Sequence, residues 1–498
     1  MRRVRTASGA TAVQIVHKRG RTVLGIDHIG SAHDEGQLAV LLEMARDRLH
    51  AGQQMLPIEE QDRGGRPTSE PVVEETTSLI VWQALEAVYA SLGFDQLADE
   101  AFKALVLARI IEPTSKADTV RVLAELGVPS PTRVTFMRCL KRVIERDYRT
   151  VIAKACYTHA TRQDGLALVL YDLTTLHFES DVEDRLRKVG MSKEHRVDPQ
   201  VTVGLLTTGS GFPLEVHLFE GNKAETKTLI PVLTGFADRH HVADVVVVAD
   251  AGMLSAANLD ALEDAGFAFI VASKPTSAAD DLANHFKRHG NYFTDGQTIE
   301  TTRTMGTGSQ ARERRVVYHY SFKRSQNDNR AINKMIERAE AVAAGTRPLK
   351  KDRFVKITDA TKAVDWKLVE RARYLAGLKG YVTNIGIDTM DGPHVVAAYN
   401  DLYQIERSFR MAKSDLAARP IFHRIRDSIE AHLTIVFTAL AVSREAQTRT
   451  SVSIKKIIQT LRPLRSATIS LGRQQITAAP RIPDQAQAIL DDLAKGEH

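Results

Sequence analysis

Two short apolar segments, each ending in an aspartate, constrain the fold of this chain more than any other feature. Residues 166–172 read LALVLYD, and residues 243–250 read ADVVVVAD. Each segment has the length and composition of a buried strand. Because open α/β sheets gather their chemistry at the carboxyl ends of their strands, Asp172 and Asp250 are candidates for one shared site. A lone Asp at a strand end is more often a cap or turn residue, so the assignment needs further support.

The order of the surrounding segments supplies part of that support. Between the two aspartates the sequence predicts strands over 201–208 and 212–219 and a helix over 225–239. A helix over 255–266 and a strand over 267–273 follow Asp250. The order β-β-β-α-β-α-β, with acids on the first and fourth strands, is that of a ribonuclease-H-like mixed sheet. We therefore predict an α/β fold of this type.

A third acid lies in the segment YNDLYQIERSFRMAK, where Tyr399, Glu406 and Lys413 follow one another at seven-residue intervals. On one continuous helix these side chains form a single row, and Arg410 lies close to it. A carboxylate flanked by a phenol, an ammonium and a guanidinium suits a site that holds a metal ion and a phosphate together. The segment alone fits equally well a solvated amphipathic helix with ordinary ion pairs.

Three carboxylates have a chemical purpose if they converge. Phosphodiester cleavage without a covalent protein intermediate needs an activated nucleophile and a stabilised leaving oxygen. Two Mg²⁺ ions about 4 Å apart provide both, and such hard cations prefer carboxylate oxygen. We expect Asp172, Asp250 and Glu406 to be metal ligands for two Mg²⁺ ions, for which Mn²⁺ can substitute.

These motifs resemble those of the DDE transposases of bacterial insertion sequences, in the group marked by the pattern Y-(2)-R-(3)-E-(6)-K. Tyr399, Glu406 and Lys413 match at the required spacing, whereas Leu402 stands at the Arg position. The resemblance spans roughly residues 75–445. It also includes YDLTTLHFES around Asp172, VADAGMLSAANL around Asp250, GFPLEVHLFEGNKAET, LAGLKGYVTN (375–384), RPIFHRIRDSIEAHLTIVFTALAV (419–442) and ARIIEPTSKADTV (108–120), the last similar to a helical segment of the group.

The resemblance implies a function and a set of residues. Asp172, Asp250 and Glu406 become the catalytic triad of an enzyme that cuts DNA at insertion-sequence ends and transfers the 3′-hydroxyl ends into target DNA. Its partners are the terminal inverted repeats and the target, both double-stranded DNA, and a second copy of the chain, because two ends are joined in a synapse. The residues expected to bind DNA phosphates or backbone are Tyr399, Arg407, Arg410 and Lys413, and either Arg407 or Arg410 can take the place of the missing Arg.

Two other functions remain open from the sequence. One is a non-catalytic protein that is derived from a transposase and binds terminal repeats. The other is a ribonuclease-H-like nuclease without strand transfer. The presence of all three acids argues against a decayed site.

We expect the chain to have five parts, because 498 residues exceed what one core serves. They are a strand-turn-strand, helix and linker (1–71), a helical domain assigned to DNA binding (72–162), the catalytic domain (163–274 and 395–445), a β-containing insertion subdomain (275–394) and a helical C-terminal tail that turns polar (446–498). The helical domain is equally well explained as a packing domain; its candidate DNA-binding residues are Arg133, Arg138, Lys141 and Arg142.

The insertion contains Trp366, one of two tryptophans in the chain. An aromatic ring there can stack on a base drawn out of the duplex near the cleaved bond. A lone Trp is more often a core residue, so both interpretations stay open.

Composition is compatible with DNA binding and with a cytoplasmic, nucleoid-associated bacterial protein. The net charge is +6 and the pI is near 9.1. From Glu406 to Arg426, six Lys or Arg residues face two acids, a local basic surface suited to phosphates. The two cysteines form no metal-binding pattern, and the adjacent His240 and His241 are expected at the surface. We expect no signal peptide and no membrane contact, since the longest apolar run, LTIVFTALAV (433–442), is too short to span a bilayer.

Overall fold

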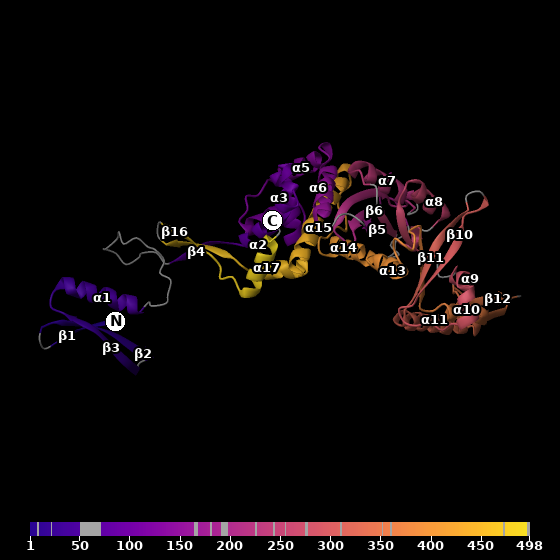
Figure 1. Cartoon of the computed structure of the whole chain (residues 1–498). Helices are drawn as coiled ribbons and strands as arrows, with labels where there is room; N and C mark the ends of the chain where they lie inside the picture. The colour runs from indigo at the N-terminus through magenta and orange to yellow at the C-terminus, as the bar shows by residue number, and fades with distance from the viewer. Residues whose placement is uncertain are drawn as a thin grey trace. The chain divides into compact units, whose positions relative to one another are not determined.

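The computed structural model describes most of the chain, and it divides the chain into two compact units, Met1–Glu70 and Pro71–His498 (Figure 1). The described residues are 1–6, 9–20, 22–49, 71–163, 168–179, 182–190, 198–224, 227–242, 245–253, 255–273, 277–308, 311–350, 352–358, 361–471 and 474–495. The predicted linker over 52–70 lies outside them. Each unit is described here by itself.

The first unit is a three-stranded antiparallel sheet with one helix. Strands β1 (Arg2–Arg5), β2 (Thr11–Arg19) and β3 (Thr22–Ala32) lie in that order, and α1 (Glu35–Leu49) packs on them. The predicted strand-turn-strand and the predicted helix are therefore confirmed as elements. Their small core consists of Val13, Ile15 and Ala45.

The second unit contains the predicted ribonuclease-H-like sheet. Strands β5 (Leu168–His177), β6 (Gln200–Thr208) and β7 (Pro213–Glu220) form an antiparallel meander. Strands β8 (Val246–Ala249) and β9 (Ala268–Ala272) then run parallel to β5. The sheet has the order β7-β6-β5-β8-β9 in this part, with α7 (Leu229–His240) and α8 (Ala256–Asp264) as connections and a short turn η3 (Ala251–Met253) after β8. The predicted fold class is confirmed.

The predicted insertion does not form a wholly separate subdomain. Strands β14 (Leu378–Thr383), β11 (Arg312–Tyr320) and β10 (Thr298–Met305) continue the main sheet beyond β9, which makes it eight-stranded. The open edge of β9 accepts β14 in antiparallel pairing. The remainder does have a core of its own, built by α11 (Phe322–Ala343), α12 (Trp366–Tyr374) and the hairpin of β12 (Val355–Thr358) and β13 (Thr361–Val364). The short helices α9 (Ala278–Asp281) and α10 (Ala283–His289) precede it.

The helices before and after the sheet pack into one body around α15 (Arg426–Thr450). This helix is buried along most of its length and contacts four helices from the N-terminal side. The helices of this body are α2 (Leu79–Ser91), η1 (Phe94–Leu97), α3 (Glu100–Ile111), α4 (Thr119–Leu126), α5 (Arg133–Glu145), α6 (Tyr148–Gln163), α16 (Ile454–Leu461) and α17 (Asp484–Ala494). Within the described residues, no helix combines the length and apolarity needed to cross a membrane.

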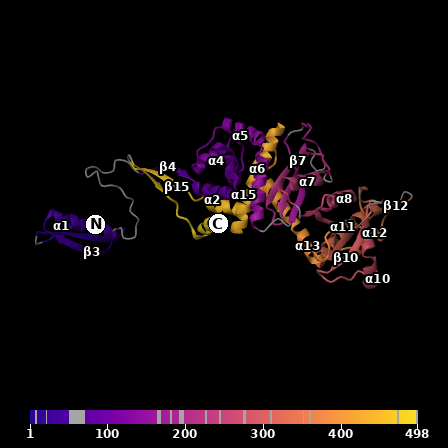
Figure 2. The same ribbon diagram turned by 45° about the horizontal axis from the view of Figure 1, so that its top comes forward.

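Four local predictions are wrong. The region from 72 begins with strand β4 (Val72–Thr77) rather than a helix, and the predicted polar tail contains β15 (Ser466–Leu471) and β16 (Gln474–Ala478), which pair with β4 in a sheet that extends away from the helices (Figure 2). Residues 112–118, predicted as part of a helix, connect α3 to α4. The His240 side chain is only 5% exposed, because it bonds the buried carboxylate of Glu215.

Candidate active site

The register of two parallel strands brings Asp172 and Asp250 side by side. Leu170 of β5 pairs with Val248 of β8, and the two aspartates each follow two residues later. Neighbouring strands lie about 4.8 Å apart, and paired residues of parallel strands point to the same face. Strand β8 ends at Ala249, whereas β5 continues to His177 because β6 pairs along its whole length. Asp172 therefore lies within a strand, not at its end as the sequence predicted.

Helix α14 (Leu402–Ser414) covers the same face of β5. Thr174 and Leu176, which alternate with Asp172 on that face, line one apolar cavity together with Phe409 and Lys413 of α14. Glu406 lies seven residues before Lys413 and thus on the same side of the helix, at an exposed position. The third acid consequently lies on the side of the sheet that carries the first two.

The helix predicted to carry Tyr399, Glu406 and Lys413 as one row is interrupted. Tyr399 belongs to α13 (Gly392–Asn400), and Asp401 separates α13 from α14. The prediction of one row is therefore wrong for Tyr399, yet this residue still reaches the site. Its hydroxyl donates a hydrogen bond of 3.0 Å to Oδ1 of Asp250, which also accepts the backbone N–H of Ala251 at 2.7 Å. The buried Tyr399 thus holds a carboxylate in place.

Lys379 of β14 is a site residue that the sequence did not reveal. Its Nζ lies 4.2 Å from the centroid of the Tyr399 ring, a cation–π distance. Burial, followed by the charge of Arg324, lowers the pKa of Lys379, and the carboxylates of Asp250 and Glu406 act in the opposite direction. The nearest sequence signal was the segment LAGLKGYVTN, which matches the pattern of the resembled family but does not indicate what its lysine contacts.

The three acids affect the pKa values of Tyr399 and Lys379. Burial raises the pKa of Tyr399, and the negative charges of Asp250 and Asp172 raise it further. Asp250 and Glu406 act on Lys379 in the same way. Each of the three acids therefore influences the pKa of Tyr399 or of the half-buried Lys379, and Asp250 influences both.

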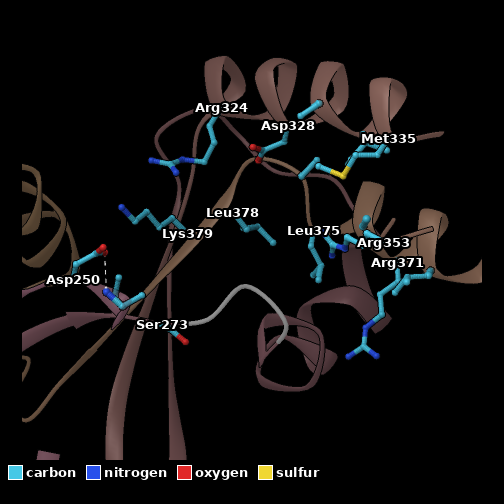
Figure 3. Close-up of a pocket in the computed structure, with 17 residues that line it drawn as sticks. Asp250, Ser273, Arg324, Asp328, Met335, Arg353, Arg371, Leu375, Leu378 and Lys379 are labelled. Atoms are coloured by element: carbon cyan, nitrogen blue, oxygen red, sulfur yellow. Dashed lines mark hydrogen bonds between the residues drawn. The ribbon is translucent and has the colours of Figure 1, made fainter. Parts of the chain in front are cut away.

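A pocket of about 440 Å³ leads from Asp250 to the helices of the insertion (Figure 3). Lys379 and Arg324 extend toward Asp250 in this view, while Arg353 and Arg371 lie at the far end. Four cations among its lining residues exceed the two acids, Asp250 and Asp328. Such a lining favours an anionic ligand that is large enough to extend from Asp250 to the insertion.

The other predicted phosphate-binding residues lie in different surroundings. Arg410 is exposed on α14, and Lys413 is partly buried over β5. Arg407 donates a hydrogen bond of 3.4 Å to the side chain of Gln404. Burial lowers the pKa of Arg444, and the positive charge of Arg407 lowers it further. Arg407 therefore faces another side of α14. Trp366 is the first residue of α12 and is 57% exposed, outside the group that lines the pocket.

The four candidate DNA-binding cations of the helical domain divide into two kinds. Arg142 forms two hydrogen bonds, of 2.8 and 2.9 Å, with the buried carboxylate of Asp99, which caps α3. The other three, all exposed on α5, are Arg133, Arg138 and Lys141. Arg142 is therefore a structural residue, and the exposed three are the ones suited to phosphate contact.

The donors fit a hard divalent cation in kind, although they do not form a closed ligand set. Among the residues that the structure describes, no group of three or more His, Cys, Asp or Glu side chains is arranged to hold a metal ion. Asp172 and Asp250 each lie two residues beyond the register pair Leu170–Val248 of adjacent parallel strands. Carboxylate oxygen is the ligand that Mg²⁺ prefers, and the Glu406 side chain is exposed.

Comparison with known proteins gives one strong match. The family model described as "Transposase DDE domain" matches residues 165–442, more than half of the chain. A solved piggyBac transposase synaptic complex with hairpin DNA is 11% identical, with a TM-score of 0.40, over 77% of this chain and 76% of that one. A Mos1 transposase paired-end complex with the left transposon end is 12% identical, with a TM-score of 0.16, over 47% and 66%. No curated protein matches.

Proposed function

The chain belongs to the DDE transposase family, and we propose that it cuts DNA at the ends of an insertion sequence and joins the freed 3′-hydroxyl ends to target DNA. The observation that carries the proposal is the register of β5 and β8, which gives Asp172 in β5 and Asp250 directly after β8 equivalent positions two residues beyond the pair Leu170–Val248, with Glu406 on the helix that packs on β5. Hydrolysis forms a bond from water oxygen to phosphorus and releases a 3′-hydroxyl. In the second step that hydroxyl attacks a target phosphodiester and displaces its 3′-oxygen.

The proposed cofactor is Mg²⁺, as two ions, with Mn²⁺ as a substitute. Asp172 and Asp250 would hold the ions between them, and Glu406 would complete the ligands of the second. When bound, the ions lower the pKa of the attacking water and stabilise the leaving oxygen.

The chain's own residues position the reaction. Tyr399 restrains one oxygen of Asp250, which leaves the other for a ligand. Lys379 offsets part of the negative charge that three acids bring together. The exposed Arg410 and the cations of the 440 Å³ pocket would hold the phosphates of the strand being cut. The partners are then the double-stranded ends and target, with two copies of the chain in the synapse.

The test is Mg²⁺-dependent nicking of a duplex that carries the end of the insertion sequence encoding this chain. We expect Asp172→Asn, Asp250→Asn and Glu406→Gln each to slow nicking by at least about a hundredfold, while DNA affinity is retained. Asp388→Asn, an exposed acid between β14 and α13, is the matched control and should nick normally.

Two outcomes would replace the proposal. A wild-type protein that binds the ends but nicks them in neither Mg²⁺ nor Mn²⁺ is a non-catalytic terminal-repeat binding protein. A protein that nicks but fails to join a pre-cut end to target DNA is a nuclease without strand transfer.

A further inference from the structure

Hydrogen bonds from other parts of the chain hold the loop between α14 and α15, residues 415–425, and the side chains that form them have no role in the proposed chemistry. Nη1 of the half-buried Arg109 donates to the carbonyl oxygens of Leu416 and Ala417, at 2.7 and 3.1 Å. The carbonyl of Ala418 accepts a hydrogen bond of 3.2 Å from His432 of α15. Three consecutive residues of the loop are thereby held by their backbones.

The second half of the loop has its own anchors. Nζ of Lys116 donates to Nε2 of His423 at 2.8 Å. Burial and the neighbouring charge of Lys116 lower the pKa of His423 to about 4, so this imidazole is neutral and able to accept. The backbone N–H of Ile421 donates to the carbonyl of His177 at 3.1 Å. The segment ARIIEPTSKADTV therefore contributes Arg109 and Lys116 as supports of a loop that follows the catalytic helix.

The side chains that this loop exposes to solvent are apolar and basic. Phe422 is 73% exposed and Ile425 is 68% exposed, with Arg424 exposed between them. An aromatic ring held in water by a rigid loop leaves its hydrophobic surface unused within this chain. An exposed aromatic ring beside a guanidinium group is the combination that proteins use to contact bases and phosphates at once.

The loop lies in line with the candidate active site. Ile421 forms a parallel bridge with Phe178, directly after β5. Phe178 donates its N–H to Pro199, on the β6 side, so Ile421 lies on the opposite edge, the edge that β8 occupies earlier along β5. Phe178 is six residues beyond Asp172, or about 20 Å at a rise of about 3.3 Å per residue. That distance corresponds to about six base pairs of a duplex.

We propose that the α14–α15 loop is a second DNA contact, in which Phe422 wedges against a base step about six base pairs from the cleaved bond and Arg424 binds a flanking phosphate. This inference rests on the proposed function, and it specifies a further position at which the protein contacts the DNA. Apolar wedges of this kind unstack a base step and bend the duplex. A rigid support favours such a contact, because little side-chain or loop ordering remains to be lost on binding.

The first experiment measures the affinity of the protein for DNA in the absence of divalent metal. It uses the fluorescence anisotropy of a 40-base-pair duplex that carries the end of the insertion sequence. We expect Phe422→Ala to weaken binding about tenfold, as the loss of one stacked ring does. Arg424→Gln is expected to weaken binding and to reduce by about one the slope of log affinity against log salt. Tyr292→Ala is the matched control, because Tyr292 is a comparably exposed aromatic (74%) in another loop.

The second experiment locates the wedge. 2-Aminopurine is placed in turn at each of the first ten positions from the cleaved bond, and its fluorescence reports unstacking. Wild-type protein is expected to raise the signal near the sixth position, and Phe422→Ala to abolish that rise. The proposal is overturned if both variants bind within twofold of wild type with an unchanged salt slope, or if the unstacked position is the same in Phe422→Ala.

The experiments distinguish failure of the loop contact from failure of the enzymatic function. If wild-type protein never nicks DNA, the proposed enzymatic function is lost, while weaker binding by Phe422→Ala still establishes the loop contact. If nicking depends on Asp172 but the loop variants bind normally, only the loop contact is lost.

Discussion

Tyr399→Phe is the sharpest probe of the candidate site, because it removes one hydrogen bond and little else. The Tyr399 side chain lies under Lys379 and packs on Tyr381, with the two tyrosine ring centroids 4.7 Å apart. A phenylalanine retains both ring contacts. What disappears is the 3.0 Å bond from the hydroxyl to Oδ1 of Asp250.

The magnitude follows from the environment of that bond. A hydrogen bond to a charged partner contributes about 1.5–3 kcal/mol, and the lower end applies because Asp250 is exposed and water can replace the donor. A loss of about 1.4 kcal/mol corresponds to a tenfold change in rate. We therefore expect single-turnover nicking in Mg²⁺ to slow about tenfold. The DNA dissociation constant and the melting temperature should change little, because the buried ring stays.

The assay mixes a preformed protein–DNA complex with Mg²⁺ and follows the nicked strand. Tyr381→Phe is the control, since it alters the neighbouring buried tyrosine and leaves the bond to Asp250 intact. A nicking rate within twofold of wild type would refute the positioning role of Tyr399. A fall in DNA affinity that accounts for the whole loss of rate would refute it equally.

Two further predictions concern stability. The buried carboxylate of Glu215 accepts hydrogen bonds from His217, Arg239 and His240; burial raises its pKa, but these bonds outweigh that effect and hold it below the ordinary value. Ionised Glu215 therefore stabilises the fold at pH values above its unfolded pKa of about 4.3, and this stabilisation is lost as the pH falls below that value. We expect Glu215→Gln to lower the free energy of unfolding by about 3 kcal/mol at pH 7. Thermal melts should show a smaller difference between the two proteins at pH 3. Arg142→Leu should destabilise the protein by a similar amount through its buried carboxylate partner, whereas Arg138→Leu should stay within about 0.5 kcal/mol and instead weaken DNA binding.

The strands of the sheet could be predicted well from the sequence, because each strand has a recognisable pattern in its own residues. The runs that became β5, β6, β7, β8 and β9 are apolar, have strand length and are bounded by polar residues. The strands of the insertion were also visible, but their place in the main sheet was not. Pairing between β14 and β9 joins residues more than a hundred positions apart, and no local pattern encodes that choice.

The site was predicted in part for the same reason. The two aspartates belong to strands whose order fixes their proximity, so topology alone brought them together. Tyr399 reaches Asp250 although the seven-residue row fails, because it lies on α13, which packs on β8 and β9, and not on α14. Lys379 was missed because its role depends on tertiary packing against the Tyr399 ring, not on its neighbours in the sequence.

Side-chain hydrogen bonds also join the helical region to the loop between α14 and α15. Arg109 and Lys116 come from the helical region, yet their hydrogen bonds end on the loop that follows the Glu406 helix. Two acids are fixed by strand register, whereas the third is carried by α14, an element whose far end this loop secures. The α14–α15 loop therefore connects the helical region to the helix that carries Glu406, through the hydrogen bonds of Arg109 and Lys116 and through the chain itself.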